Sequence, residues 1–413
     1  MAESLKGAGA SMRILVQKFG GTSVKSKEMR DAAIDKILAA KERGFSPVVV
    51  VSAIGRKGDP YATDTLIHFA RGEAGGELRP RENDMLLSCG EVISAVIMAA
   101  ALEQRGVAAK AVTGWQAGIY TNERFGNASY TEADPSRLFE MVNAGQVPVV
   151  CGFQGITRGG DVTTLGRGGS DTTAAILGLA LHAEAVEIYT DVDGVMTADP
   201  RLLPEARVIS DVSYNEVFQM ADHGAKVIHP KAVEIAMRGN VPLIVRNTAN
   251  DATGTRISAV ATSEDAQNVL SGIAYAGGRA QVKVSGLTAI TEKDLLGALA
   301  ADGISIDLIN IFPDSVVVTI DEDRTEKARA LLERLALDFH IITDLGKVSA
   351  IGERMRGVPG VMARIIRALS GEGVSVLQTA DSHMTISCLI RDEDAQRAVR
   401  ALHEEFMLAG SKE

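Results

Sequence analysis

The last third of the chain repeats itself at a constant offset of 70 positions. The segment Gly303–Ile306 recurs as Gly373–Val376, and apolar residues on both sides keep the same offset without a gap. A period this long indicates a duplicated small domain rather than a solenoid of short repeats. Each copy reads strand, helix, strand, strand, helix, which is typical of a ferredoxin-like βαββαβ unit. We therefore predict two such units, at residues 268–345 and 346–410, with the strand near residues 269–275 as a candidate to complete the second.

Residues 14–262 alternate short apolar, β-branched runs with helical stretches such as 85–105 and 172–181. Strands that are apolar almost throughout are buried on both faces, and the helices between them supply the cover. The polar segment 262–267 separates this region from the repeats. The predicted fold class is therefore α/β, a mostly parallel sheet between helices, followed by the two ferredoxin-like units. The strand candidates are Pro47–Val51, Val147–Val150, Val186–Tyr189 and Leu243–Val245.

The motif KFGGTS at residues 18–23 lies between an apolar run and a helical stretch at residues 24–43. Its two glycines have no Cβ, so their backbone can approach an anion closely. The hydroxyls of Thr22 and Ser23 can cap the helix, whose N-terminus attracts negative charge, and Lys18 adds a mobile cation. The motif predicts a phosphate cradle, although an ordinary strand-to-helix turn would have the same pattern. The common P-loop pattern does not occur in the chain.

A second glycine-rich segment, residues 163–173, joins a strand to an apolar helix. Arg167 lies between glycines, and its planar guanidinium suits a carboxylate or a phosphate. Ser170 or Asp171 can cap the helix. A capped turn alone does not require an arginine at this place, so we interpret the segment as a binding site for an anion.

Two further segments place carboxylates where a ligand could meet them. Asp191 and Asp193 follow a buried strand, at the sheet edge where open α/β domains bind ligands, and could hold Mg²⁺ directly or through water. The calcium-binding EF-hand pattern is incomplete there, and we discard it. Glu91 lies among apolar residues, where a carboxylate is unfavourable without a cationic partner; the alternative is that it faces the solvent.

The composition limits the classes of function. A net charge of −10 over 413 residues argues against a broad nucleic-acid surface and suits an enzyme that acts on small molecules. The three cysteines are far apart without metal-ligand spacing, so we expect buried thiols in a reducing compartment. No apolar run reaches the length that crosses a membrane, and we expect a cytoplasmic protein.

Three of these motifs, taken in order, resemble the aspartate kinase family of the amino-acid kinase superfamily: residues 18–23, 165–171 and 190–194. The C-terminal duplication is similar to the paired regulatory ACT domains of that family. Residues 58–64 and 378–383 look most like the monofunctional, diaminopimelate-sensitive type of Gram-positive bacteria. The resemblance covers essentially the whole chain.

The resemblance implies that residues 14–262 form a catalytic domain that phosphorylates the side-chain carboxylate of L-aspartate with ATP and Mg²⁺. The product, 4-phospho-L-aspartate, starts the pathway to lysine through diaminopimelate, and to threonine and methionine. A side-chain carboxylate has a pKa of about 4 and is already ionised near neutral pH, so no protein base is needed. Catalysis then reduces to positioning and charge neutralisation.

The resemblance also implies roles for individual residues. Lys18 would contact the transferring phosphoryl group, Arg167 a carboxylate of aspartate and Glu91 its α-ammonium group, while Asp171 joins Lys18 and Arg167 in the catalytic set. The other substrate contacts would be Ser52, Thr63, Gly168, Gly169 and Ser170. The other nucleotide contacts would be Phe19, Gly20, Gly21, Thr22, Ser23, Ser52, Ser170, Thr190, Asp191, Arg201, Lys226 and Val227. No residue is assigned as a direct ligand of Mg²⁺, which the ATP phosphates would hold.

Paired ACT domains imply feedback regulation by an amino-acid effector, meso-diaminopimelate first and lysine or threonine next, in a homo-oligomer built from dimers. The second repeat has the turn Val-Pro-Gly at residues 358–360, where an effector can meet backbone groups, whereas the first has Thr-Ala-Ile at residues 288–290. Two other interpretations stay open. One is a kinase of glutamate or acetylglutamate, and the other is a non-catalytic amino-acid sensor.

Overall fold

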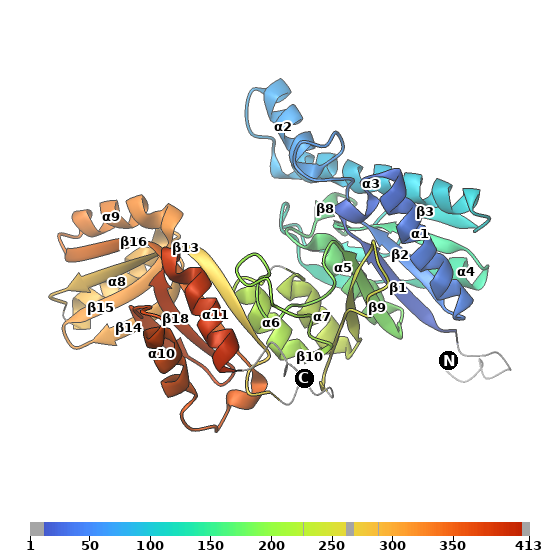
Figure 1. The fold of residues 1–413 in the computed structure, drawn as a ribbon. Helices are drawn as coiled ribbons and strands as arrows, with labels where there is room; N and C mark the ends of the chain where they lie inside the picture. The colour runs from blue at the N-terminus through green and yellow to red at the C-terminus, as the bar shows by residue number, and fades with distance from the viewer. Residues whose placement is uncertain (1–11, 226, 262–267, 288, 407–413) are drawn as a thin grey trace, which may run out of the picture. The chain divides into compact units, whose positions relative to one another are not determined.

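The computed structural model describes residues 12–225, 227–261, 268–287 and 289–406, with the side chains of 289–293 excepted. These residues form two compact units, each with its own sheet (Figure 1). The first unit contains the chain up to Val195, residues 210–218, and the described residues from 227 to 261; the second contains residues 196–209, 219–225, and the described residues from 268 onward.

This division differs from the predicted boundary, because two segments within the predicted domain 14–262 belong to the second unit. Leu203, in one of them, is 3% exposed and packs in the apolar core of the second repeat. In the same segment, the Thr197 carbonyl accepts a hydrogen bond from the Ile273 amide at 2.8 Å. The sequence could not indicate this exchange, because an apolar residue does not show which core buries it.

An eight-stranded sheet forms the centre of the first unit. Its strand order is β10-β12-β11-β9-β1-β2-β6-β3, and neighbouring strands are parallel except for β11 with β12. The predicted α/β class with a mostly parallel sheet is therefore confirmed. The strands are β1 (Ile14–Phe19), β2 (Ser46–Val51), β3 (Ala109–Val112), β6 (Val147–Cys151), β9 (Ala185–Thr190), β10 (Asp211–Ser213), β11 (Leu243–Asn247) and β12 (Thr255–Ser258).

Helices cover this sheet (Figure 1). A small second sheet in this unit has the strand order β5-β4-β7-β8. The small sheet consists of β4 (Ile119–Thr121), β5 (Tyr130–Ala133), β7 (Gln154–Ile156) and β8 (Val162–Thr164). The helices are α1 (Lys27–Glu42), α2 (Thr63–Ala74), α3 (Pro80–Gln104), α4 (Ser136–Asn143), α5 (Gly169–Ala180), α7 (Pro230–Gly239) and the part of α6 (Tyr214–Asp222) up to residue 218.

The side chains of β1 alternate between the two faces of the sheet, as the pleat of a strand requires. Phe19 is fully buried in a cluster that includes Ile34 of α1 and Met98 of α3. Lys18 points to the opposite face, where its Nζ atom pairs with Asp171 of α5. The sheet thus carries a basic side chain at the carboxyl end of a central strand and aims it at the start of a helix.

The prediction that Thr22 or Ser23 caps the helix after the first motif is wrong. The motif ends in a 3₁₀ turn, and α1 begins only at Lys27, with Ser26 as its cap. The Ser26 hydroxyl accepts a hydrogen bond from the Met29 amide at 3.3 Å. Thr22 and Ser23 therefore belong to the turn itself.

The second glycine-rich segment also has a different cap from the predicted one. The helix α5 begins at Gly169, and its N-cap residue Gly168 has a φ of +66°, a conformation that favours glycine. Ser170 and Asp171 lie inside the first turn, and no side chain caps the helix. The two side chains are consequently not used for capping.

The long helix α3 corrects two expectations. We expected no segment able to cross a membrane, but these 25 residues are long and apolar enough, with a mean hydropathy of 2.0 over their most apolar window. Half of that window is buried in the protein, and the core helix of a domain passes the same test, so the helix argues only weakly for a membrane span. Cys89 on this helix is exposed, contrary to the expected burial of all cysteines, whereas Cys151 and Cys388 are buried.

The second unit is built on one six-stranded antiparallel sheet with the order β14-β15-β13-β16-β18-β17. Its strands are β13 (Gly272–Ser285), β14 (Ile306–Phe312), β15 (Ser315–Asp321), β16 (Asp338–Ile351), β17 (Gln378–Asp381) and β18 (Thr385–Arg391). Its helices are α8 (Ala289–Ala301), α9 (Thr325–Arg334), α10 (Val361–Gly371) and α11 (Ala395–Glu405).

The two repeats share the central strands β13 and β16, each 14 residues long. The later part of β13 pairs with β15 of the first repeat, and its beginning, Gly272–Ala276, pairs with Lys347–Ile351 of β16. That same part of β16 pairs with β18 of the second repeat. The strand expected near residues 269–275 is thus the first part of β13, and the predicted boundary between residues 345 and 346 falls inside β16.

Leu299 and Leu369 hold equivalent places in the two repeats and are 2% and 0% exposed. Each change to alanine should lower the free energy of unfolding of the second unit by about 2–5 kcal/mol, because a cavity is left behind. Leu335→Ala is the control, since this leucine is 37% exposed and its loss should cost less than about 1 kcal/mol. Denaturant unfolding followed by circular dichroism measures the difference; equal effects of Leu335→Ala and Leu369→Ala would contradict the assigned core.

Candidate active site

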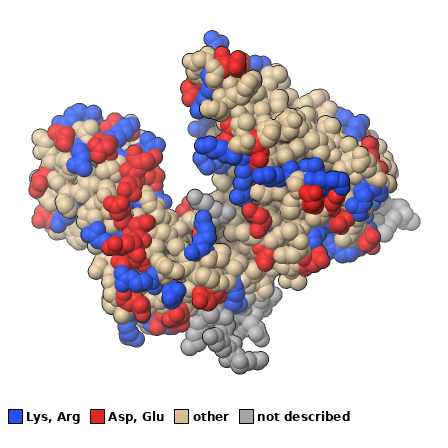
Figure 2. All heavy atoms as spheres, turned by 45° about the horizontal axis from the view of Figure 1, so that its top comes forward, with Lys and Arg blue, Asp and Glu red and all other residues tan. Residues whose placement is uncertain are grey.

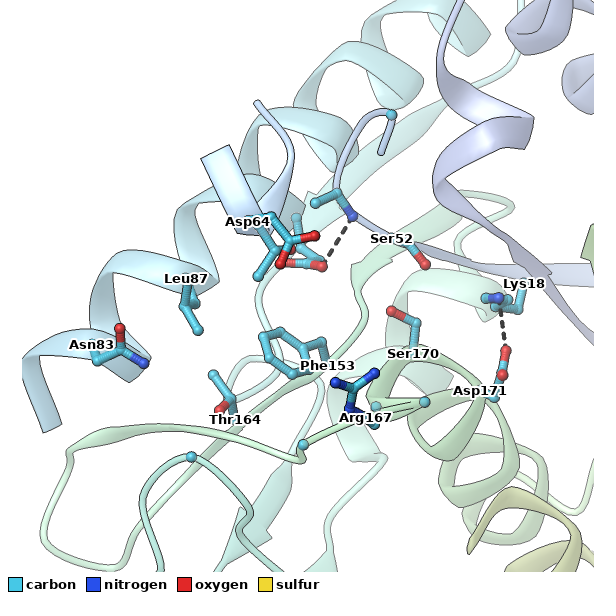
Figure 3. A pocket seen from close by; sticks show the side chains of 18 residues that line it. Lys18, Ser52, Asp64, Asn83, Leu87, Phe153, Thr164, Arg167, Ser170 and Asp171 are labelled. Atoms are coloured by element: carbon cyan, nitrogen blue, oxygen red, sulfur yellow. Dashed lines mark hydrogen bonds and ion pairs between the residues drawn. The ribbon is translucent and has the colours of Figure 1, made fainter. Parts of the chain in front are cut away.

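A pocket of about 490 Å³ opens at the carboxyl edge of the large sheet in the first unit (Figure 3). It is lined by residues from β1, the loops after β2 and β8, and the helices α2, α3 and α5. The structure thereby brings together all the residues predicted to bind substrate and all three predicted catalytic residues. They are Lys18, Ser52, Thr63, Glu91, Arg167, Gly168, Gly169, Ser170 and Asp171.

Lys18 reaches the pocket from the end of β1. It is 8% exposed, and its Nζ atom lies 2.7 Å from Oδ1 of Asp171 in the first turn of α5. Burial of a single charge would be costly, and the opposite charge offsets that cost. The pair therefore holds the Lys18 amine at the pocket.

The glycine turn after β1 lies under the loop that follows β2. The Gly55 amide donates to the Gly21 carbonyl at 3.0 Å. A Cβ at Gly21 would stand 2.6 Å from the Gly55 carbonyl oxygen and 2.7 Å from that of Ala53, so only glycine fits. The turn is thus fixed by close backbone approach.

The side chains of Phe19 and Ser23 turn away from the pocket. The Phe19 ring stacks on Tyr189 with a centroid distance of 4.8 Å. The Ser23 hydroxyl is buried and shares a hydrogen bond of 2.6 Å with the hydroxyl of Thr248. Phe19, Gly20, Gly21, Thr22 and Ser23 do not line the pocket, and their predicted nucleotide contacts stay predictions.

The start of α5 shapes the opposite wall of the pocket. A Cβ at Gly168 would stand 2.2 Å from Cβ of His229, and one at Gly169 would stand 2.5 Å from the Phe153 ring. Glycines are therefore required at both positions. Arg167, directly before them, is exposed and has no carboxylate partner among the residues that the structure describes. Figure 3 shows its guanidinium between Phe153 and Ser170.

Glu91 is deeply buried in the middle of α3, at 3% exposure, which excludes the solvent-facing alternative. Its Oε1 atom accepts a hydrogen bond from the Ala53 amide at 2.9 Å, and its Oε2 atom has no hydrogen-bond partner in the part of the chain that the structure describes. Burial raises the pKa of this carboxyl group to about 8. A buried acid with an unused oxygen at a pocket is suited to a cationic group of a ligand.

The loop that contains Ala53 can approach Glu91 because its neighbour in the helix is a glycine. A Cβ at Gly90 would stand 2.8 Å from Cβ of Ala53. Glycine in the interior of a helix costs about 1 kcal/mol relative to alanine, so its presence here has a packing reason. In the motif Ser-Cys-Gly-Glu at residues 88–91, the glycine thus permits the close approach of the loop, and the glutamate is the buried acid.

Sequence reasoning missed several residues around the pocket. Asp84 is fully buried on α3 and accepts hydrogen bonds from the Gly126 amide, the Thr164 amide and the Thr164 hydroxyl at 2.8–2.9 Å. Burial raises its pKa. Nothing in the local sequence marked this acid, because its partners are distant in the chain. Thr164 and Gly166 line the pocket and lie within the predicted segment 163–173. The lining residues that were missed are Ala53, Gly55, Asp64, Asn83, Leu87, Gly126 and Phe153.

Phe153 is one of these residues, and its backbone is unusual. Its φ is +68°, which is uncommon for a residue that has a Cβ. Its amide donates to the Thr173 hydroxyl of α5 at 3.0 Å. A strained conformation that surrounding contacts hold in place is frequent at functional sites.

The other predicted nucleotide contacts that the structure describes are not among the residues lining the pocket. Thr190 and Asp191 stand at the end of β9, where the Asp191 carboxylate pairs with Arg56. Arg201 belongs to the second unit and pairs with Asp199 there. Val227 is half-buried, and Lys226 lies outside the described residues. Within the described chain, no group of three or more His, Cys, Asp or Glu side chains could hold a metal ion.

Charges are unevenly distributed around the protein. Although the net charge is −10, Lys and Arg side chains gather in a band on the face shown in Figure 2. Inside the pocket, the cations Lys18 and Arg167 face the acids Asp64, Glu91 and Asp171. The pocket of this acidic protein thus offers an anionic ligand two cationic side chains.

Known protein families match most of this chain. The model of the amino acid kinase family matches residues 13–247, and that of an ACT domain matches residues 341–404. Aspartokinase 1 of Bacillus subtilis is 46% identical over 404 residues, which cover 96% of this chain and all of that protein. The chain belongs to the aspartokinases. It is a kinase, and the expected kinase fold followed by ACT domains is confirmed.

Solved aspartokinase structures have the same fold. The Escherichia coli aspartokinase III complex with aspartate and ADP has a TM-score of 0.78 and 27% identity, and covers 96% of this chain and 100% of its own. The complex of the same enzyme with lysine and aspartate has a TM-score of 0.74 and 27% identity, with 95% and 99% covered. These two structures are described as R-state and T-state.

Proposed function

We propose that this aspartokinase transfers the γ-phosphoryl group of ATP to the side-chain carboxylate of L-aspartate, forming 4-phospho-L-aspartate and ADP. The charge pattern of one pocket supports this proposal most. Arg167, which has no carboxylate partner among the described residues, lines the same cavity as the buried acid Glu91 and the ion pair of Lys18 with Asp171. L-Aspartate carries two carboxylates and one ammonium group, which match these charges. The related enzyme binds aspartate and ADP.

Arg167 and Glu91 are the two residues that select an amino acid. The guanidinium of Arg167 can hold a carboxylate through two parallel hydrogen bonds. The α-ammonium group of the substrate would pair with the free Oε2 atom of Glu91 and return this carboxyl group to its ionised form. Ser52 and Thr63, which also line the pocket, would complete the contacts to aspartate.

Lys18 is the residue that would act on the phosphoryl group during transfer. Its amine would leave Asp171 and neutralise charge on the transferring phosphoryl group, while Asp171 keeps the amine in place before ATP binds. The attacking carboxylate is ionised near neutral pH, so no general base is needed. The reaction then depends on positioning and on charge neutralisation.

Mg²⁺ would arrive with the triphosphate and neutralise part of its charge. Asp171 and Asp191, the acids of the two later motifs, are both engaged in ion pairs. We therefore propose that the phosphates of ATP provide the main ligands of the ion. This agrees with the hard, oxygen-rich coordination that Mg²⁺ prefers.

The function is tested by trapping the acyl phosphate as a hydroxamate with aspartate, glutamate or acetylglutamate as acceptor. We expect product with aspartate, and a loss of at least about 100-fold in turnover for Lys18→Ala, because one electrostatic contact to the reacting group is removed. Lys27→Ala is the control, since this exposed lysine pairs with Asp31 of its own helix. Preference for glutamate would contradict the substrate, and near-normal turnover of Lys18→Ala would contradict its role.

We also propose feedback inhibition by an amino acid at the second unit, in a cytoplasmic homo-oligomer built from dimers. The second repeat has a cavity of about 250 Å³ between the turn 357–361 and the hairpin that carries Asp381, Ser382 and His383. Charged side chains and a glycine-containing turn suit a zwitterionic ligand. Residue 288 of the corresponding turn in the first repeat lies outside the described residues. The related enzyme binds lysine in its T-state.

Titration of the kinase activity with amino acids tests this regulation. We expect meso-diaminopimelate to inhibit, with lysine and threonine as the next candidates. Asp381→Asn should weaken inhibition without changing turnover in the absence of effector, because the cavity belongs to the second unit. Activity that none of the three amino acids changes, alone or combined, would contradict the proposal.

A further inference from the structure

The loop between β2 and α2 covers the glycine turn after β1. The Gly55 amide donates to the Gly21 carbonyl at 3.0 Å, and the loop residues Ser52, Ala53 and Gly55 line the pocket together with Lys18. Arg56 follows directly in this loop. Its guanidinium is therefore attached next to the turn that we expect to hold phosphate.

Arg56 makes an ion pair that crosses the end of β1. Its Nη2 atom lies 2.6 Å from Oδ2 of Asp191. Arg56 follows β2 and Asp191 follows β9, and both strands are parallel neighbours of β1 in the sheet. The pair consequently spans the carboxyl edge of the strand between them, where Phe19 ends β1 and the glycine turn begins.

This ion pair is exposed and can be exchanged at little cost. The side chains of Arg56 and Asp191 are 68% and 49% exposed. Solvent-exposed ion pairs contribute only about 0–1 kcal/mol, whereas arginine binds phosphate with two charge-assisted hydrogen bonds. A phosphate at the glycine turn would therefore compete well with Asp191 for the guanidinium.

The loop does not need the Arg56 side chain to keep its place. Oδ2 of Asp59 accepts a hydrogen bond from the Arg56 amide at 2.8 Å and lies 3.2 Å from the Lys25 amine. These contacts hold the pKa of Asp59 below its usual range, the hydrogen bond from the backbone being the larger cause. The guanidinium can thus move while the backbone that carries it stays fixed.

We propose that Arg56 is a nucleotide-phosphate-binding residue that exchanges its partner, from Asp191 in the free enzyme to the terminal phosphates of the bound nucleotide. Arg56 and Lys18 then hold the phosphates from two neighbouring strands, and Asp191 is released to meet another part of the nucleotide. This inference rests on the proposed function, because it takes the glycine turn as the phosphate site.

Calorimetric titration of the full-length enzyme with ADP and, separately, with aspartate tests the exchange. Arg56→Gln should weaken ADP binding by about tenfold or more and leave aspartate binding within about twofold, since only a contact to phosphate is lost. The ADP affinity of Arg56→Lys should fall between those of the wild-type enzyme and Arg56→Gln, because lysine keeps the charge but lacks the planar fork of donors. Arg71→Gln is the matched control, because Arg71 is another exposed arginine of this unit whose partner is Glu77.

The possible results distinguish a phosphate-binding role of Arg56 from a supporting role in the loop and from a failure of the proposed function. ADP affinity that is unchanged in Arg56→Gln overturns the proposal, and so does an equal loss of ADP and aspartate affinity, which would show that the residue only supports the loop. Melting temperatures of the variants identify a general loss of structure. If Arg56→Gln has lost its structure, the ADP and aspartate affinities of Arg56→Lys are compared with those of the wild-type enzyme instead. If the wild-type enzyme forms phosphoaspartate while Arg56→Gln binds ADP normally, only this inference fails. If the wild-type enzyme binds no nucleotide, the proposed function fails with it.

Discussion

The burial of one carboxylate in the long helix α3 is the constraint on which the site depends. Glu91 can be buried because the loop after β2 approaches the helix at Gly90 and offers the Ala53 amide as a donor. The same loop lies on the glycine turn of β1, so the acid and the turn are positioned by one segment. The cost of burying an acid with a free oxygen is consistent with a ligand that supplies the missing cation.

The parallel sheet positions the other charged residues of the site, Lys18, Asp171 and Arg167. Because β1 is a central strand, its alternation places Phe19 in the core and Lys18 toward α5, where Asp171 balances its charge. The glycines before α5 allow close contact with neighbouring groups and leave Arg167 at the rim of the pocket. Strand ends, one helix start and one loop thus supply charges of both signs within a single cavity.

The sequence predicted those features that depend on local patterns. Apolar strands, glycine motifs and the duplication identified the α/β domain and the repeats. The apolar neighbours of Glu91 indicated a buried acid, with a solvent-facing side chain as the alternative that the structure excludes. Features that depend on distant partners could not be predicted. Asp84 resembles any acid in the first part of a helix until Gly126 and Thr164 are seen to donate to it. In the same way, a repeat period does not reveal that β13 and β16 serve both repeats.

The central claim is that Glu91 is a neutral acid in the free enzyme and becomes the anion that binds the ammonium group of aspartate. Its pKa of about 8 in the free site means that the carboxyl group is mostly protonated near neutral pH, and pairing with a cation lowers that pKa. Calorimetry of aspartate binding in two buffers of different ionisation enthalpy measures the protons exchanged. Release of up to about one proton per aspartate, lost in Glu91→Gln and fading as the pH rises above the free-site value, is the predicted result. Binding without proton release, or with equal release in Glu91→Gln, would contradict the account.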